Sequence, residues 1–400
     1  MTRSRPMVRQ SALDRLTPLR DAPVRQAITD AGVPFAVWHA ALFGLAAFAS
    51  AYLAPIATTV DGAGRSEPIW AHFDAAYYVG IADGGYSAGP GDEWAFYPLY
   101  PALVHVVGYI GGGGHTANIV AGLVVSNLAG VAAAVVLHRL VSADWGLGVA
   151  RRTAVYFAVT PLGFYLSAVY AESLFVLLAV ATLLLTRRHR WVAAGAVAAL
   201  AAATRPPGVM LTLVLVAEVV VVVIAARRTG AALSLLRPLV GIVLAPMGLV
   251  AFLAFGWVRT GDLFVTFRVN ADRWHRELDW PWVAIDHAIR DASWGDPRDY
   301  LFGPLNLAVV AVCLVALVVM IRQFPPTHTV FTAAMLALPI CSGQLQAVGR
   351  QSLPIVTVLV LLATLTRSRA STAHQMVVAV FAGLCTVFLV MYVLVVPAIA

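Results

Sequence analysis

The stretch GVMLTLVLVAEVVVVVIAA, residues 208–226, indicates what class of protein this is. It carries one charged residue, Glu218, and two arginines follow it. A helix needs about 20 predominantly apolar residues to cross the hydrocarbon core of a bilayer, which is roughly 30 Å thick. The stretch therefore predicts a transmembrane helix, and the sequence shows no partner for Glu218 within it.

Apolar blocks of this kind recur along the chain. Of the 400 residues, 60% are hydrophobic and 12% are charged, whereas a soluble domain averages roughly 25% charged residues. The backbone of a block inside lipid must satisfy its own hydrogen bonds, and the blocks lack the alternation of barrel strands, so we expect helices. The prediction is an all-α, polytopic membrane protein with about eleven spans, at 34–56, 116–138, 153–169, 172–186, 191–204, 208–226, 239–258, 301–321, 328–343, 353–366 and 375–397.

The distribution of arginine predicts the orientation of these spans. All 27 basic residues are arginine. If the N-terminus is cytoplasmic, 18 arginines and 4 acids fall on that face, and 9 arginines and 15 acids on the other. Cytoplasmic loops carry the basic excess. We therefore expect a cytoplasmic tail (1–33) and one transmembrane domain (34–400) in the plasma membrane, with the C-terminus outside, and no nucleic-acid partner despite the pI near 9.6.

This orientation leaves two long segments on the external side, at about 57–115 and 259–300. Both are rich in aromatic and charged residues. Such segments form amphipathic helices that lie in the headgroup region, with Trp and Tyr at the interface. The predicted cytoplasmic connections are short, so we expect any chemistry on the external side.

Asp74 is the candidate catalytic residue, in the external stretch HFDAAYYVGIADGGY (72–86). A carboxylate beside the membrane among aromatic residues is partly desolvated, which raises its pKa toward the range of a general base. The alternative is an exposed acid that caps a short helix. In the same stretch we predict that His72, Tyr77 and Tyr78 bind substrate.

The segment EWAFYPLYP (93–101) supplies two further aromatic candidates. Pro98 and Pro101 each lack a backbone donor and cannot both lie inside an ordinary helix, so we expect a rigid turn. Tyr97 or Tyr100 could stack on a sugar, or the segment could be a structural plug in the headgroup region.

Ionisable residues at the external ends of spans are candidates for binding. Glu172 opens a span, where such groups usually face a cavity or a partner, although the helix dipole also favours an acid there. Arg205 and Arg350 interrupt apolar runs. The guanidinium fork suits a phosphate, whereas an arginine that snorkels to the interface is the alternative. We add Gln351, which follows Arg350.

The second external segment contributes Trp274 and Arg276. Arginines recur there beside tryptophans, which indicates either a platform for sugar and phosphate or an interfacial helix. In neither case does the pattern point to a metal.

Four segments together resemble the GPI mannosyltransferase 2 family (the PIG-V type) and its prokaryotic relatives, in the GT-C superfamily of integral-membrane glycosyltransferases. They cover residues 70–282, and Phe73 and Ala171 depart from the family's Trp and Thr. The segments are HFDAAYYVGIADGGY with FYPLYP, PLGFYLSAVYAESLF, AAATRPPGVML, and GDLFVTFRVNADRWHRELDWPW.

The resemblance implies an inverting transfer of mannose from a polyprenyl-phosphate-mannose donor to a lipid, glycan or protein of the cell envelope, on the non-cytoplasmic face. Asp74 matches the family's catalytic acid and would accept the proton of the acceptor hydroxyl. Arg205 or Arg350 would stabilise the leaving phosphate, so no metal or other cofactor is expected.

Three alternatives remain open. A related enzyme could use another polyprenyl-phosphate sugar, such as arabinose. A transporter or flippase would show paired repeats and ionisable groups at the midplane, and the sequence contains no internal repeat. A non-catalytic subunit of envelope assembly is the third.

Overall fold

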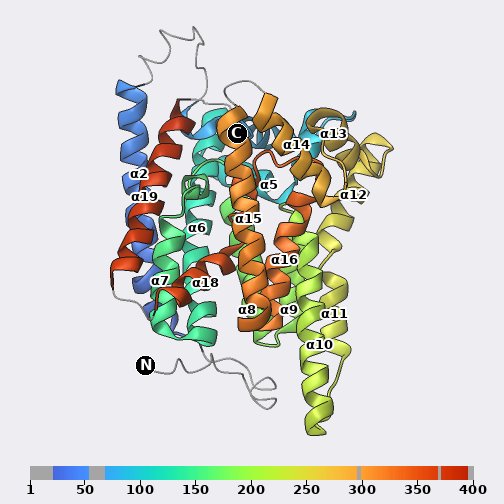
Figure 1. Cartoon of the computed structure of the whole chain (residues 1–400). Coiled ribbons are helices and arrows are strands. Elements are labelled where there is room, and N and C mark those ends of the chain that lie inside the picture. Colours follow the sequence, from blue (N-terminus) through green and yellow to red (C-terminus); the bar gives the residue numbers. More distant parts are fainter. Residues whose placement is uncertain (1–20, 54–67, 295–298, 368–370, 395–400) are drawn as a thin grey trace.

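The computed structural model describes residues 21–53, 68–294, 299–367 and 371–394, and this part of the chain contains helices and no strand. It confirms the predicted all-α class (Figure 1). Six helical runs are long and apolar enough to cross a membrane: Val24–Tyr52, His115–Trp145, Pro206–Thr229, Leu236–Thr260, Gly303–Gln323 and Thr372–Val393. The predicted total of eleven is not confirmed, because the other blocks form shorter helices.

These shorter helices are α7 (Leu147–Ala158), α8 (Glu172–Arg187), α9 (Trp191–Ala202), α16 (Pro326–Ile340) and α18 (Val356–Leu365). The predicted span 153–169 is wrong in its second half. Helix α7 ends at Ala158, and one 3-10 turn, η5 (Gly163–Leu166), precedes α8. Pro161 lacks a backbone donor and disfavours a helical residue before it. Irregular backbone at membrane depth is tolerated where protein surrounds it, and Tyr165 and Tyr170 in this segment are 0% exposed.

Helix α6 (His115–Trp145) is the centre of the bundle and packs against α5, α7 and α8. It continues beyond the predicted end at 138. Where helices come closest, glycine is required: a Cβ on Gly195 of α9 would lie 2.2 Å from the Gly241 oxygen of α11 (Leu236–Leu244). Small residues at such contacts allow helix backbones to approach each other in membrane proteins.

The two ends of the described chain lie at opposite ends of the bundle. Helix α1 (Val24–Ala27) continues through η2 (Ile28–Gly32) into α2 (Val33–Tyr52), so the helix begins before the predicted boundary at 34. The residue Ala22 bonds Ser142 of α6 at 3.0 Å. Helix α19 (Ser371–Val393) instead brings Tyr392 to within 3.4 Å of the His72 ring.

The end of the bundle that holds His72 also carries the two predicted external segments. The first contains η3 (Ile69–Ala71), α4 (Ala75–Gly84), η4 (Asp92–Ala95) and α5 (Leu99–Ile110). Pro98 and Pro101 stand at the start of α5, so the predicted turn is a helix start. The second contains α13 (Val265–Trp274) and α14 (Pro281–Trp294), which follow α12 (Met247–Thr260) and precede α15 (Asp299–Gln323) at the upper end of Figure 1. Residues 54–67 and 295–298, which belong to these predicted segments, lie outside the described residues.

Candidate active site

Four charged side chains meet where helices begin or break. Asp74 stands just before α4, and Glu172 is the first residue of α8. Arg205 lies between α9 and the 3-10 turn η6 (Pro206–Met210), and Arg350 lies in α17 (Val348–Gln351). We call these four side chains the Asp74 cluster. Segments far apart in the sequence therefore bring four of the five predicted charged residues together.

The cluster is a chain of ion pairs. Arg350 Nη2 lies 2.7 Å from Asp74 Oδ2, and Arg350 Nε lies 3.5 Å from Glu172 Oε1. Arg205 pairs with the same oxygen of Glu172. Asp74 makes no capping hydrogen bond to α4, so the capping alternative is not supported. The Asp74 side chain is 25% exposed, whereas that of Glu172 is 1% exposed. Asp74 is therefore the accessible end of the chain.

Two tyrosines hold Arg350 from the irregular segment before α8. The guanidinium carbon lies 5.4 Å from the centre of the Tyr165 ring and 5.1 Å from that of Tyr170. A desolvated cation–π contact contributes about 2 kcal/mol. Tyr170 also donates a hydrogen bond to the His72 oxygen at 2.8 Å, which links it to the turn before Asp74. Sequence reasoning missed both tyrosines because it assigned Tyr165 to a span and Tyr170 to the short connection after it; Pro161 was the one signal of a break.

Arg276 adds a third guanidinium beside the cluster. Its Nη2 donates to the Gln346 oxygen at 3.0 Å, and the amide oxygen of Gln351, in its favourable orientation, accepts from the same nitrogen at 3.2 Å. Burial and the positive charge of Arg350 lower the pKa of Arg276 to about 10, so it remains protonated at neutral pH.

The balance of charge at the site is positive. None of the ion pairs among the described residues joins Arg276 to a carboxylate, whereas Arg205 and Arg350 pair with Glu172 and Asp74. Three arginines therefore stand against two carboxylates. An anionic group placed among them would restore neutrality.

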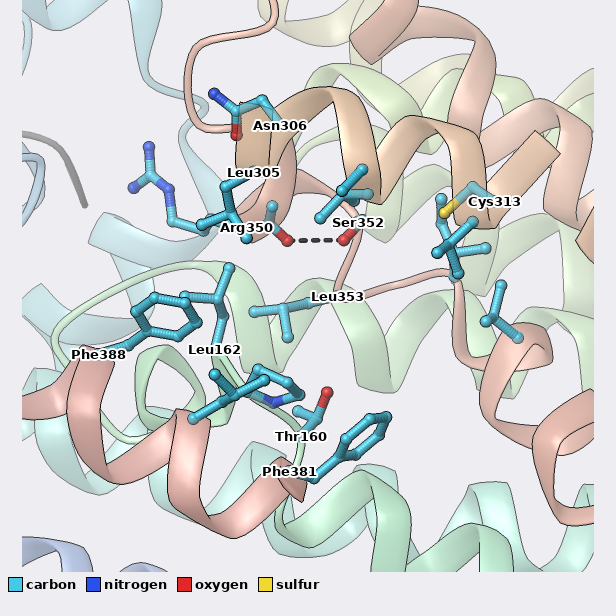
Figure 2. A pocket seen from close by; sticks show the side chains of 18 of the residues that line it. Thr160, Leu162, Leu305, Asn306, Cys313, Arg350, Ser352, Leu353, Phe381 and Phe388 are labelled. Atoms are coloured by element: carbon cyan, nitrogen blue, oxygen red, sulfur yellow. Dashed lines mark hydrogen bonds between the residues drawn. The ribbon is translucent and has the colours of Figure 1, made fainter. Parts of the chain in front are cut away.

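An apolar cavity of about 310 Å³ lies beside Arg350. Its walls come from α15, α18, α19 and the break after α7, and they include Leu162, Leu353, Phe381 and Phe388. In Figure 2 the Arg350 guanidinium lies at the edge of the lining side chains, on the side away from Phe381. An apolar cavity with a cation at its edge suits an amphiphile with an anionic head.

The predicted aromatic residues divide into two groups. Tyr77 stacks on Phe96 with ring centres 4.6 Å apart, and Trp274 meets Tyr77 edge-on at 5.8 Å. Tyr77 and Trp274 are partly exposed and form an aromatic wall. The charge of Asp74 is among the influences that raise the pKa of Tyr77, after burial and the charge of Asp92, which places this wall near Asp74.

The other predicted aromatic residues are buried. Tyr97 is 3% exposed and Tyr100 is 0% exposed, and the Tyr100 hydroxyl shares a hydrogen bond with that of Ser126 at 2.8 Å. Packing covers both rings in this structure, which favours the alternative of a structural plug over stacking on a sugar. Tyr78 and His72 are 6% exposed and lie behind the cluster. Within the described part of the chain, no group of three His, Cys, Asp or Glu residues is arranged to hold a metal ion.

Comparison with known proteins identifies the family. The family model for mannosyltransferases of the PIG-V type matches residues 47–252, more than half of the chain. The matched region contains Asp74, Glu172 and Arg205, whereas Arg276 and Arg350 lie beyond it. No curated protein matches the chain in sequence.

Two solved structures are similar in fold. ArnT from Cupriavidus metallidurans, crystallised with undecaprenyl phosphate, gives a TM-score of 0.52 at 14% identity over 88% of this chain and 63% of ArnT. The Archaeoglobus fulgidus oligosaccharyltransferase, tethered to an acceptor peptide, gives a TM-score of 0.44 at 14% identity over 89% of this chain and 55% of the other. The chain thus spans less than two thirds of the length of either.

The likeness to ArnT shows a shared fold, and the described residues of the present chain contain six helical runs long and apolar enough to cross a membrane. The match to the family model agrees with the resemblance read from the sequence. The chain belongs to the PIG-V mannosyltransferase family, and its fold is that of a multi-pass membrane protein similar to ArnT.

Proposed function

We propose that this protein transfers mannose, with inversion, from polyprenyl-phosphate-mannose to a lipid, glycan or protein acceptor of the cell envelope. The observation that carries the proposal is the apolar cavity beside Arg350, at a site where the Asp74 cluster and Arg276 together place three arginines against two carboxylates. The arginine asymmetry of the sequence favours the non-cytoplasmic face of the plasma membrane as the side of reaction.

The donor is bound in two parts. Its polyprenyl chain lies in the cavity between α15, α18 and α19, which Leu353 and Phe388 line. Its phosphate is held by Arg350 and Arg276, because guanidinium groups form strong, charge-assisted hydrogen bonds with phosphate oxygens. That the similar structure of ArnT was determined with undecaprenyl phosphate supports this choice of donor.

Asp74 is the general base. It accepts the proton of the acceptor hydroxyl while that oxygen attacks the anomeric carbon, and the bond from this carbon to the phosphate oxygen breaks with its electrons left on the phosphate. Arg350 stabilises the charge that develops on the leaving group. The Arg350 that pairs with Asp74 in this structure thus also serves the phosphate, so donor binding loosens the ion pair and prepares the base. The arginines supply the positive charge that a metal would otherwise bring.

The acceptor approaches over the aromatic wall of Tyr77 and Trp274. The wall is partly exposed and close to Asp74. An exposed aromatic face packs well against the apolar face of a sugar. Inversion requires the acceptor oxygen, with Asp74 beside it, to attack the face of the anomeric carbon opposite the phosphate.

Purified protein in lipid, incubated with radiolabelled polyprenyl-phosphate-mannose and envelope extracts, tests the proposal directly. We expect labelled product from the wild type and none from Asp74→Asn, with donor binding retained in the variant. Polyprenyl-phosphate-arabinose is the competing donor. Faster transfer from that donor would replace mannose by arabinose, and absence of transfer from both would overturn the proposal.

A further inference from the structure

Four residues other than glycine have a left-handed backbone among the described residues. Their φ angles are 57° at Phe73, 56° at His189, 49° at His275 and 60° at Ala347. A residue with a Cβ adopts this conformation at a cost, because the Cβ crowds the following carbonyl. Such strain persists only where the surrounding structure imposes it, and it concentrates at functional sites.

Three of the four positions lead directly into the candidate site. Phe73 precedes Asp74, and His275 precedes Arg276. Ala347 is the residue before α17, the single turn that carries Arg350 and Gln351. The amide of Gln351 bonds back to the Ala347 oxygen at 2.9 Å. The direction of the Arg350 side chain therefore depends on the turn at Ala347.

The turns at His275 and Ala347 are also bonded to each other. The Gln344 side chain donates to the Trp274 oxygen at 2.9 Å and to the His275 oxygen at 3.0 Å. In return, Arg276 donates to the Gln346 oxygen. These cross-links hold two guanidiniums close together although their charges repel. Without a backbone that imposes the arrangement, repulsion would turn them apart.

We propose that Phe73, His275 and Ala347 are positioning residues, whose left-handed backbone holds Asp74, Arg276 and Arg350 in the arrangement that receives a lipid phosphate. The phosphate rests on the proposed function, whereas the strained arrangement rests on backbone geometry alone. The strained turns also explain why the site lies where helices begin or end. Consecutive side chains along a helix point in different directions, and these turns redirect them toward one another.

The chain contains its own control. His189 has the same backbone conformation at the end of α8, where Arg190 bonds back to the Leu185 oxygen at 2.9 Å. It lies at the other end of the molecule, with its ring 3.5 Å from Glu218. Removing strain at His189 should therefore affect α8 and leave the Asp74 cluster unchanged.

The test is Ala347→Gly, because glycine adopts a positive φ freely and the change removes only a methyl group. In full-length protein we expect an unchanged or higher melting temperature and about tenfold faster amide exchange over residues 345–352. Binding of undecaprenyl phosphate should weaken about tenfold, by loss of orientation of Arg350. Ala347→Asn should stay close to wild type in amide exchange and in binding of undecaprenyl phosphate, since asparagine tolerates this conformation. His189→Gly should alter neither amide exchange over residues 345–352 nor binding of undecaprenyl phosphate.

The outcomes separate the two proposals. Unchanged exchange at 345–352 in Ala347→Gly overturns the positioning role, and so does a global rise in exchange with a lower melting temperature. If the wild type binds no undecaprenyl phosphate but Ala347→Gly still raises local exchange, the positioning role stands and the proposed donor is wrong. The pair His275→Gly and His275→Asn repeats the test for Arg276. The glycine variant should weaken binding and the asparagine variant should not, as at Ala347.

Discussion

The protein contains two buried clusters of charged side chains with similar chemistry and opposite character. The Asp74 cluster has been described. The second, which we call the Arg187 cluster, comprises Asp144, Arg187, Glu218 and His328 at the other end of the bundle. Arg187 lies 2.8 Å from Asp144 and 2.9 Å from Glu218, and His328 lies 2.8 Å from Asp144. The cluster joins α6, α8, α16 and α10 (Leu211–Thr229).

The two clusters differ in how completely their carboxylate oxygens are hydrogen-bonded. In the Arg187 cluster, side-chain exposure is at most 4%, and both oxygens of each carboxylate are bonded; Thr327 donates to the second oxygen of Glu218. The one buried atom of this cluster without a hydrogen bond among the described residues is His328 Nδ1. In the Asp74 cluster, Glu172 Oε2 has no hydrogen bond among the described residues, and Arg350 lines a cavity. Carboxylates whose oxygens are all bonded indicate a structural role, and a carboxylate oxygen without a partner near a cavity indicates a site that binds a ligand.

Asp74→Asn should have the largest effect on transfer. It removes the proton acceptor at the accessible end of the cluster, and general-base catalysis contributes about 10²- to 10⁴-fold in rate. We expect transfer of labelled mannose to fall by that factor, with little change in melting temperature because the side chain is 25% exposed.

Asp144→Asn is the matched control for this change. It should lower the melting temperature, and the protein that remains folded should keep its specific activity. If Asp144→Asn abolished transfer in folded protein while Asp74→Asn did not, the two clusters would have to exchange roles.

Arg187→Gln should have the largest effect on stability. Removing one partner of a buried ion pair leaves uncompensated charge and costs about 3–5 kcal/mol, and here Arg187 serves two carboxylates. We expect a large loss of folded protein in thermal-shift measurements in detergent. Transfer per folded molecule should be retained. A melting temperature equal to that of the wild type would show that the Arg187 cluster does not stabilise the fold.

Arg350→Gln should show the reverse of Arg187→Gln, with the main loss in ligand binding and not in stability. The size of its effect should be intermediate. It removes the cation beside the apolar cavity, and one strong hydrogen bond to a charged group contributes about 1.5–3 kcal/mol. We expect the Kd for undecaprenyl phosphate to rise by about 10- to 100-fold, since 1.4 kcal/mol is tenfold. Acceptor binding should change little, and an equal loss for both substrates would contradict a phosphate role.

Local hydropathy predicted most of the helices, and its failure at one break has a physical reason. The run from Tyr156 to Ala171 is apolar whether it crosses lipid or lies irregularly inside the protein. Only Pro161 distinguishes the two cases, and one proline does not settle where a helix ends. Only the structure shows that residues 163–171 are buried in protein, whereas Pro161 and Leu162 line the cavity.

The candidate site was predicted residue by residue, but its geometry was not. Asp74, Glu172, Arg205 and Arg350 each stood out as charges beside apolar runs, whereas their pairing depends on the convergence of distant segments. For the same reason Glu218 showed no partner in sequence, although Arg187 binds it. For Tyr97 and Tyr100 the sequence left a sugar stack and a structural plug open, because an aromatic residue near an interface has the same pattern whether it faces ligand or core.

Tyr170→Phe should have the smallest effect and is the finest test of the comparison. It removes the hydroxyl that donates to the His72 oxygen and leaves the ring on which Arg350 rests. The net loss of one hydrogen bond is about 1 kcal/mol. Part of that loss should appear as a transfer rate lowered by about two- to fivefold, because the turn that orients Asp74 is released, while the affinity for undecaprenyl phosphate stays the same.

Tyr156→Phe supplies the matched loss away from the site. Its hydroxyl bonds Thr366 at 3.0 Å and His374 at 2.9 Å, and the side chain is 0% exposed, as is that of Tyr170. The two variants should lose similar stability, but only Tyr170→Phe should lose rate, because only its hydroxyl is tied to the backbone that carries the base. Equal rates in the two variants would mean that the Asp74 turn does not depend on Tyr170 for its orientation.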